Sequence, residues 1–249
     1  MILTDKQEER YARQIGLEEI GMEGQKKLLN AKILIIGAGG LGSPAAMYLA
    51  AAGAGTIGIA DSDSVDLSNL QRQILHSVKD IGRSKVISAS ESMRALNPDV
   101  TVIPYNVFLK GDNIRQIIRD FDFVLDCTDN FSSKFIINDA CILEGKPFVH
   151  AGIMNFSGQL MTYVPGQGPC YRCIFKEPPE AETAAPGVIG AVAGTIGCLQ
   201  ALEAIKYITG AGQLLTGCLL TFDGLKMEFR KLKLPKSESC PVCGNLADE

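Results

Sequence analysis

The stretch from Gly37 to Gly42 has the residue types and spacing of a phosphate-binding loop. It follows the apolar run Lys32–Ile36, contains Gly37, Gly39, Gly40 and Gly42, and leads into alanine-rich sequence. In a strand–turn–helix unit, the first glycine permits a tight turn, the next lets backbone amides approach a phosphate, and the last lets the helix pack on the strand. A helix start also carries unpaired N–H groups, so this stretch predicts an anion site.

An acidic residue follows at the distance expected for a nucleotide site. Asp61 ends a second apolar run, 56–60, about 20 residues beyond the glycines, which is where a carboxylate meets a ribose hydroxyl. Together with the strand before the glycines and the helix after them, Asp61 predicts a nucleotide site. It does not identify the nucleotide.

The polar segment after Asp61 leaves the carboxyl end of its strand, where open α/β sheets place ligands. Asn69 and Arg72 are three residues apart, so one helical turn would direct both the same way, and Lys85 starts the next helix. Arg72 and Lys85 would neutralise a triphosphate and a departing pyrophosphate. The alternative is a solvated, charged loop.

A further carboxylate follows the strand Phe123–Asp126, at the same edge of the expected sheet. Asp129 lies beside Asn130, and either residue could simply cap the next helix. A carboxylate beside a polyphosphate is also a Mg²⁺ ligand, because this ion prefers oxygen. One carboxylate with two or more cations indicates metal-assisted attack at phosphorus.

Two C-x-x-C pairs occur late in the chain, at Cys170 and Cys173 and at Cys240 and Cys243. Four thiolates suit a structural zinc ion, and this site would join distant segments without an open position for catalysis. The alternative is two redox dithiols or unlinked thiols. The other four cysteines are in apolar surroundings and are predicted to be core residues: Cys127, Cys141, Cys198 and Cys218.

Alternating apolar runs and helical patterns predict a Rossmann-like, doubly wound, mostly parallel α/β sheet. Strands are expected at 32–36, 56–60, 100–106, 123–126 and 147–150, and helices at 4–29, 40–52, 84–96, 112–120 and 131–143. After Ala151 the pattern changes to antiparallel strands, Gly158–Val164 and Leu219–Arg230, with Asp223-Gly224 as a hairpin turn. We expect one domain, 1–249, with an N-terminal arm (1–30), a nucleotide-binding core (31–150) and a C-terminal part (151–249) that contains the zinc site.

A long uncharged segment, Thr183–Leu202, precedes Glu203 and Lys206, which continue its helical pattern. It is rich in glycine and alanine rather than leucine, so a packed helix is favoured over a membrane span. Its glycines recur at three- and four-residue steps and are expected on one packed face: Gly187, Gly190, Gly194 and Gly197.

Composition restricts the partners and the compartment. The chain of 249 residues has a net charge of −4, which argues against a general nucleic-acid binder. The polar start, Met1–Arg10, is unlike a signal peptide, so a cytoplasmic protein is expected.

Taken together, these residues resemble the ThiF/MoeB/HesA family, the bacterial relatives of ubiquitin-activating enzymes. The resemblance runs from about Arg10 to Gly244. Its matching pieces are Arg10-Tyr-x-Arg13-Gln, Gly-Ala-Gly-Gly-Leu-Gly, Asp61 with Asn69-Leu-Gln-Arg72-Gln73, Gly82-x-x-Lys85, Asp126-Cys-Thr-Asp129-Asn130 and both cysteine pairs.

The resemblance implies an enzyme that uses ATP and Mg²⁺ to adenylate a small ubiquitin-fold sulfur carrier protein ending in Gly-Gly. The carrier carboxylate attacks the α-phosphate and pyrophosphate leaves. The acyl adenylate then accepts sulfur, as in molybdopterin or thiazole synthesis.

The resemblance also implies roles for particular residues. Gly39 and Gly40 line the phosphates, Asp61 holds the ribose, and Asp129 binds Mg²⁺. The phosphate chain is contacted by Asn69, Arg72, Gln73 and Lys85. Arg13 reaches the nucleotide of a partner subunit, which implies a homodimer. The glycine-rich helix and the loop Lys176–Pro186 would contact the carrier.

Two features of the sequence depart from many relatives. Thr183 stands where they carry a cysteine, and a hydroxyl is a poor substitute for a thiolate, so we expect no covalent carrier intermediate on this loop. No rhodanese domain follows Cys243, so a separate protein is expected to donate the sulfur.

Two other classes of function use the same glycine loop. An NAD-dependent oxidoreductase would need a proton donor near the hydride, for which the only histidines are His76 and His150. A non-catalytic nucleotide-binding adaptor would keep the fold without the reaction.

Overall fold

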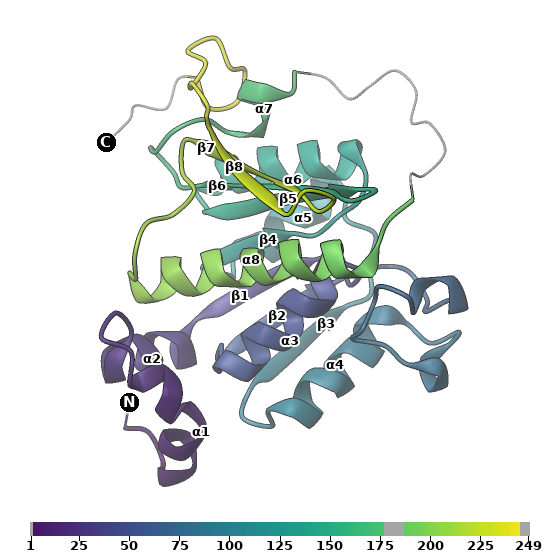
Figure 1. Ribbon diagram of the computed structural model, residues 1–249, viewed down its shortest axis with the longest axis vertical. Helices are drawn as coiled ribbons and strands as arrows, with labels where there is room; N and C mark the ends of the chain where they lie inside the picture. The colour runs from purple at the N-terminus through teal and green to yellow at the C-terminus, as the bar shows by residue number, and fades with distance from the viewer. Residues whose placement is uncertain (1, 177–186, 245–249) are drawn as a thin grey trace.

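The computed structural model describes residues 2–176 and 187–244. Its strands form one sheet in the order β3-β2-β1-β4-β5-β6-β7-β8 (Figure 1). The first five pair in parallel, and β6, β7 and β8 continue the sheet in antiparallel pairing. The predicted parallel core with an antiparallel extension is therefore confirmed.

The strands are β1 (Lys32–Ile36), β2 (Thr56–Ala60), β3 (Thr101–Tyr105), β4 (Phe123–Asp126), β5 (Phe148–Met154), β6 (Ser157–Tyr163), β7 (Cys218–Asp223) and β8 (Glu228–Lys233). The helices are α1 (Asp5–Ile15), α2 (Gly21–Asn30), α3 (Gly42–Ala52), α4 (Lys85–Leu96), α5 (Gly111–Ile118), α6 (Phe131–Leu143), α7 (Tyr171–Ile174) and α8 (Gly190–Thr209). Two short 3-10 helices, η1 (Leu67–Asn69) and η2 (Val78–Asp80), lie in the segment between β2 and α4.

Helices cover both faces of the parallel strands. Ile33 and Ile35 of β1 pack toward α3, α4 and α8, whereas Leu34 and Ile36 pack toward α5 and α6. Successive residues of a strand point to opposite faces, and both faces are covered by helices, so all four side chains are buried. This two-sided burial explains why the parallel strands are continuous apolar runs.

The N-terminal arm differs from the single helix predicted over 4–29. The helix α1 begins with a capping box between Thr4 and Gln7 and ends at Gly16. A second helix starts at Gly21, whose φ of 56° is in the left-handed region. Gly21 divides the segment, since a left-handed residue cannot continue a right-handed helix.

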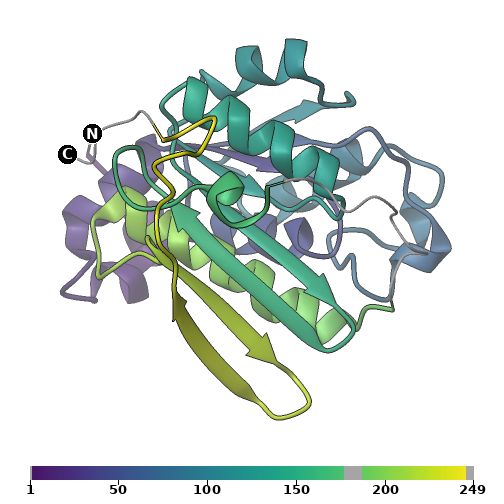
Figure 2. The same ribbon diagram turned by 90° about the horizontal axis from the view of Figure 1, so that it is seen from above.

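Among the later strands, β5 is longer than the sequence indicates, whereas β6 is shifted by one residue from the predicted Gly158–Val164. β5 continues beyond His150 to Met154 and turns back into β6. The hairpin predicted over Leu219–Arg230, with its turn at Asp223-Gly224, is confirmed: β7 ends at Asp223, and β8 starts at Glu228 and continues to Lys233. Figure 2 shows this hairpin extending beyond the helical layers.

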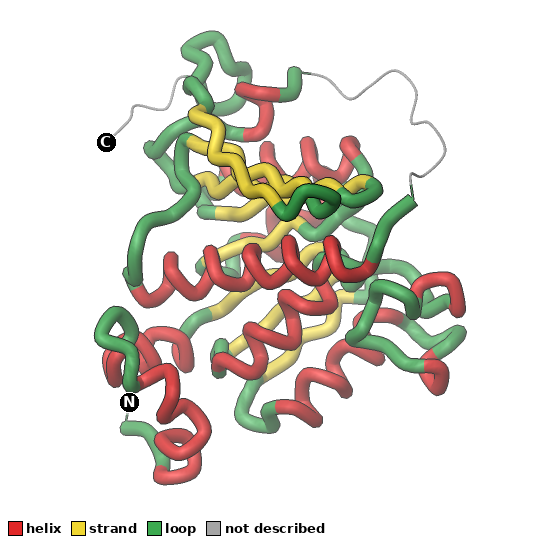
Figure 3. The backbone as a smooth tube through the Cα atoms, in the orientation of Figure 1, coloured by secondary structure: helices red, strands yellow, loops and turns green. Residues whose placement is uncertain are grey.

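The long helix α8 crosses the sheet (Figure 3). A Cβ at Gly190 would lie 2.4 Å from Gln71 O and one at Gly197 would lie 2.3 Å from Leu41 O, so both glycines permit close packing. The prediction of one shared glycine face is wrong for the other two, because Gly187 precedes the helix and Gly194 faces open space. Within the described ranges, no helix is long and apolar enough to span a membrane.

Candidate active site

Three loops leave the sheet side by side, at the carboxyl ends of β1, β2 and β4. Ile36, the last residue of β1, pairs with Ala60 of β2 on one side and with Asp126 of β4 on the other. The glycine loop, Asp61 and the turn 127–130 therefore begin at one edge of the sheet. This is the edge at which open α/β sheets bind ligands.

Glycine is sterically required at two positions of the loop. Gly37 has a φ of 101°, and a Cβ there would lie 2.7 Å from Cys127 O. A Cβ at Gly42 would lie 1.9 Å from Gly37 O. The loop therefore depends on both residues to turn and to pack against the start of α3.

Asp61 is held against this loop by its backbone. Its Oδ2 accepts a hydrogen bond from Ala38 N at 2.8 Å, and its Oδ1 accepts one from Asp63 N at 2.9 Å. Each carboxylate oxygen retains a further lone pair, so the side chain can still accept a ribose hydroxyl.

Arg72 and Gln73 flank the two central glycines. A Cβ at Gly40 would lie 3.3 Å from Arg72 Cγ, and one at Gly39 would lie 3.6 Å from Gln73 Nε2. Gln73 is only 3% exposed, and its Oε1 has no hydrogen-bond partner among the described residues. A buried polar atom without a partner beside a glycine cradle fits a site that binds a polar ligand.

Asn69 and Lys85 are both engaged within the chain. Asn69 Oδ1 accepts from Asp66 N at 3.2 Å, which completes the capping box of η1. Lys85 Nζ forms an ion pair with Asp63 Oδ2 at 2.8 Å, and its side chain is only 7% exposed. A phosphate would therefore have to share or displace the Lys85–Asp63 pair.

The turn after β4 is built around a buried carboxylate. Asp126 Oδ1 accepts from Thr128 N at 3.0 Å and from Thr128 Oγ1 at 2.6 Å. Burial opposes the charge, but Lys134 and His150 outweigh it and hold the pKa of Asp126 well below its usual range. Asp126 is therefore ionised at neutral pH.

Asp129 and Asn130 follow in this turn and differ in role. Asn130 Oδ1 accepts from Ser133 N at 2.8 Å and caps α6, as one of the two readings of the sequence predicts. Asp129 is exposed, and its carboxylate forms no hydrogen bond or ion pair with any other described residue. A free carboxylate at this edge fits the donor set that Mg²⁺ requires.

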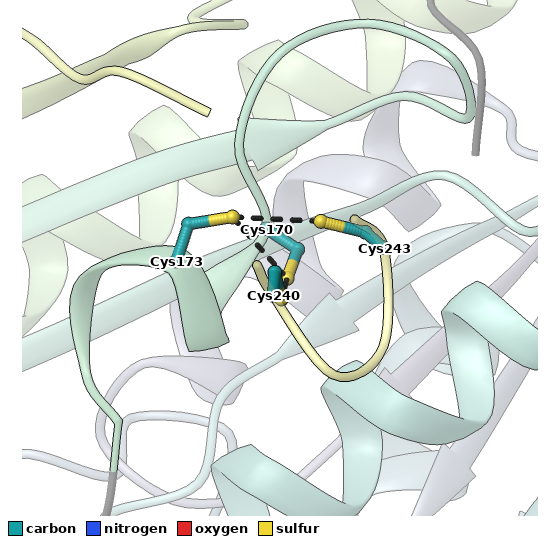
Figure 4. Close-up of side chains that lie close together, drawn as sticks. All are labelled: Cys170, Cys173, Cys240 and Cys243. Atoms are coloured by element: carbon teal, nitrogen blue, oxygen red, sulfur yellow. Dashed lines mark hydrogen bonds between the residues drawn. The ribbon is translucent and has the colours of Figure 1, made fainter. Parts of the chain in front are cut away.

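The four cysteines of the two C-x-x-C pairs converge from distant segments (Figure 4). The Sγ atoms of Cys170 and Cys240 are 3.6 Å apart, and those of Cys173 and Cys243 are 3.4 Å apart. Sulfurs at about 2.3 Å from a tetrahedral zinc ion would be about 3.8 Å from one another. The quartet therefore fits zinc, and all four cysteines are free thiols rather than disulfides.

The remaining cysteines agree only partly with the predicted core positions. Cys127 and Cys141 are buried, and burial raises the pKa of both thiols. Cys198 and Cys218 are half-buried, which the apolar surroundings in the sequence do not reveal.

Arg13 lies away from this edge in its own chain. It belongs to α1, and Tyr11 of the same helix accepts a hydrogen bond from Asn97 and contacts Gly53 at the opposite end of the sheet. In Figure 1, α1 lies beyond one end of α3, whereas the loop that follows β1 leads into the other end. Arg13 is exposed on α1 and is not among the residues gathered at this edge.

Residues 11–242 match the family model described as the ThiF family. The chain belongs to the ThiF family. It is 45% identical over 248 residues to the adenylyltransferase and sulfurtransferase MOCS3 of Xenopus laevis, covering 98% of this chain and 55% of that protein. It is also 45% identical over 246 residues to the SAMP-activating enzyme E1 of Haloferax volcanii, covering 97% of this chain and 91% of that protein.

This ThiF-family chain also resembles a solved structure, E. coli MccB with MccA-N7isoASN. The TM-score is 0.87 at 25% identity, covering 96% of this chain and 75% of that one. The chain spans about half the length of the MOCS3 relatives, as the 55% coverage shows.

Two buried side chains of this family member were not predicted as site residues. His76 Nε2 donates to Ala38 O at 3.1 Å, and its Nδ1 accepts from Ser88 Oγ at 2.9 Å, so the ring fixes the glycine loop. Gln200 of α8 donates to Asp126 O at 2.8 Å. The sequence singles out His76 only as one of two histidines, and the predicted Thr183 and most of the loop Lys176–Pro186 lie outside the described residues.

Proposed function

We propose that this chain adenylates the C-terminal glycine of a small ubiquitin-fold sulfur carrier protein ending in Gly-Gly, with release of pyrophosphate. The observation that carries the proposal is the gathering of the glycine loop, Asp61, Arg72 and the free Asp129 carboxylate at one sheet edge. Family membership supports it, since relatives are named as an adenylyltransferase and as an activating enzyme E1. MccB crystallised with ATP shares the fold, with a TM-score of 0.85.

The proposed reaction begins with ATP bound across the carboxyl ends of β1 and β2. Backbone N–H groups of Gly39 and Gly40 at the start of α3 would face the phosphates, and Asp61 would accept a ribose hydroxyl. Arg72 and Gln73 would contact the phosphate chain from the neighbouring segment. Lys85 would join them by exchanging Asp63 for a phosphate oxygen.

The chemical step is an in-line displacement at the α-phosphorus. A carboxylate oxygen of the carrier forms the new P–O bond, and the bond to the β-phosphate breaks with its electrons leaving on pyrophosphate. Arg72, Lys85 and the partner subunit's Arg13 would offset the charge on the leaving group. Mg²⁺, held through Asp129, would neutralise and orient the phosphates when bound.

The chain's thiols point to a separate sulfur donor. Burial raises the pKa of Cys127, the cysteine nearest the site, so it is a poor nucleophile at neutral pH. The cysteine quartet would hold zinc with all four ligands and leave none free. A carrier acyl adenylate would therefore receive sulfur from a donor other than these five cysteines.

The proposal is tested by ATP–pyrophosphate exchange with a purified Gly-Gly-ended carrier. We expect exchange with the intact carrier and none with a carrier whose terminal carboxylate is amidated. An Asp129→Asn variant should keep its unfolding temperature and lose at least 100-fold in exchange, on the order of other single-residue losses of charge stabilisation.

Two outcomes would select the other classes of function. Carrier binding without exchange would identify a non-catalytic adaptor. Nicotinamide bound to the purified protein would identify an oxidoreductase, although His150, one of its two candidate proton donors, is buried against Asp126.

A further inference from the structure

A buried polar cluster lies behind the turn that carries Asp129. Its members, Asp126, Lys134 and His150, are each less than one-tenth exposed. Asp126 Oδ2 accepts from Lys134 Nζ at 3.3 Å and from His150 Nδ1. Lys134 Nζ also donates to Ala151 O at 2.6 Å, so its ammonium group is fixed between two acceptors.

Within this cluster, His150 provides orientation rather than charge. Lys134 already offsets the charge of Asp126, and burial lowers the pKa of His150, which is therefore neutral at pH 7. Because a carboxylate only accepts, the His150 proton is on Nδ1, and Nε2 is left as an acceptor. That Nε2 has no partner among the described residues.

The ring of His150 lies between aromatic side chains and a small cavity. The His150 ring packs against Phe148 and Tyr171, with centroids at 4.9 Å and 4.4 Å. The adjoining cavity has a volume of about 20 Å³, which is room for one water molecule. A phenylalanine would fit the same packing without the orphan nitrogen, so the N–H donated to Asp126 is what only the histidine supplies.

The consequence of that N–H reaches the site through Asp126. With His150 and Lys134 on Oδ2, the other oxygen is directed at Thr128, whose N–H and hydroxyl both donate to it. Both ends of the carboxylate are thus engaged, and the backbone of the turn is fixed up to the residue before Asp129. Groups that hydrogen-bond directly to a metal ligand commonly change metal affinity by 10- to 100-fold when removed, and His150 acts one residue further back, so the lower end of this range is expected.

We propose that His150 is a positioning residue for Asp129: by orienting Asp126, it holds the 126–129 turn so that the Asp129 carboxylate meets the Mg²⁺ of bound ATP. The inference rests on the proposed function, because it assigns the purpose of the Asp129 carboxylate.

The test compares His150→Phe, His150→Asn and Met161→Ala in the full chain. Phenylalanine keeps the ring packing and removes the N–H, whereas the asparagine amide restores a donor near the position of Nδ1. Met161 pairs directly with His150 across β5 and β6 and lines the same cavity, but it makes no polar contact with the turn. It therefore controls for loss of packing.

We expect His150→Phe to raise the Mg²⁺ concentration for half-maximal pyrophosphate exchange about tenfold. His150→Asn should remain close to the wild type, and Met161→Ala should lower the unfolding temperature without changing the Mg²⁺ dependence. The same Mg²⁺ dependence is measured for ATP binding by calorimetry without a carrier. A wild-type chain without exchange would then refute the proposed function alone.

An unchanged Mg²⁺ dependence in His150→Phe would overturn the positioning role, as would equal shifts in His150→Phe and Met161→Ala. Should His150→Phe fail to fold, Thr128→Val removes the hydroxyl donor on the other carboxylate oxygen. It must then show the same rise in Mg²⁺ requirement, and wild-type behaviour would reject the proposal.

Discussion

A methyl group added at Gly42 should abolish tight nucleotide binding. The new Cβ would lie 1.9 Å from Gly37 O, whereas side-chain carbons essentially never approach closer than 3.0 Å. The carbonyl or the start of α3 must therefore move by about 1.1 Å. A displacement of about 1 Å in positioned groups can reduce function about 100-fold, so we expect Gly42→Ala to weaken ATP binding by at least this factor.

Gly194 supplies the matched control for this substitution. It is also a glycine of a helix covering the same face of the sheet, and a Cβ there meets no atom within 4 Å. Gly194→Ala should stabilise the protein by up to about 1 kcal/mol through helix propensity and leave ATP affinity unchanged. Calorimetric titration with ATP and a thermal unfolding curve are measured for both variants. ATP binding by Gly42→Ala within threefold of the wild type would refute the steric argument.

Three further predictions concern the metal, the histidines and the subunits. Cys240→Ser should remove bound zinc and lower the unfolding temperature by roughly 5–15 °C, the range for loss of one cross-link, while Cys218→Ser keeps the metal; full zinc occupancy by elemental analysis would contradict this. Burial lowers the pKa of His76 below 6.5, so the unfolded state binds the proton first and the free energy of unfolding falls as pH decreases below about 6.5. His76→Gln should flatten this slope in urea unfolding at pH 5 to 8, and an equally steep slope would exclude His76 as its source. Arg13→Ala and Lys85→Ala should each lack exchange, yet a refolded mixture should recover about a quarter of wild-type activity through randomly formed twofold dimers with one intact site; no recovery would count against a shared site.

The sequence predicts the parallel strands well because each is a short apolar run buried on both faces. Lys32–Ile36 and Phe123–Asp126 are found with the predicted bounds. The division of the N-terminal arm was missed, since a glycine inside a helical pattern does not reveal its φ. Gly21 adopts a left-handed conformation in the folded chain, and this conformation prevents one continuous helix.

The candidate site shows the same limit at the level of side chains. The spacing of Gly37 and Gly42 and the position of Asp61 predict their proximity, because they adjoin neighbouring strands. The hydrogen bond from His76 to Ala38 joins residues 38 positions apart, and the ion pair of Lys85 with Asp63 depends on how the polar segment returns to the sheet. Such contacts depend on tertiary packing, which local sequence patterns do not reveal.

The cysteine quartet has a topological consequence once a metal is bound. The corresponding cysteines of its two pairs are 70 positions apart, and the chain between the pairs contains α8 and the β7–β8 hairpin. Metal–sulfur bonds would turn this section into a closed ring. A single peptide-bond break anywhere between residues 174 and 239 would then open the ring without releasing either fragment, so the chain would remain one molecule until the metal was removed.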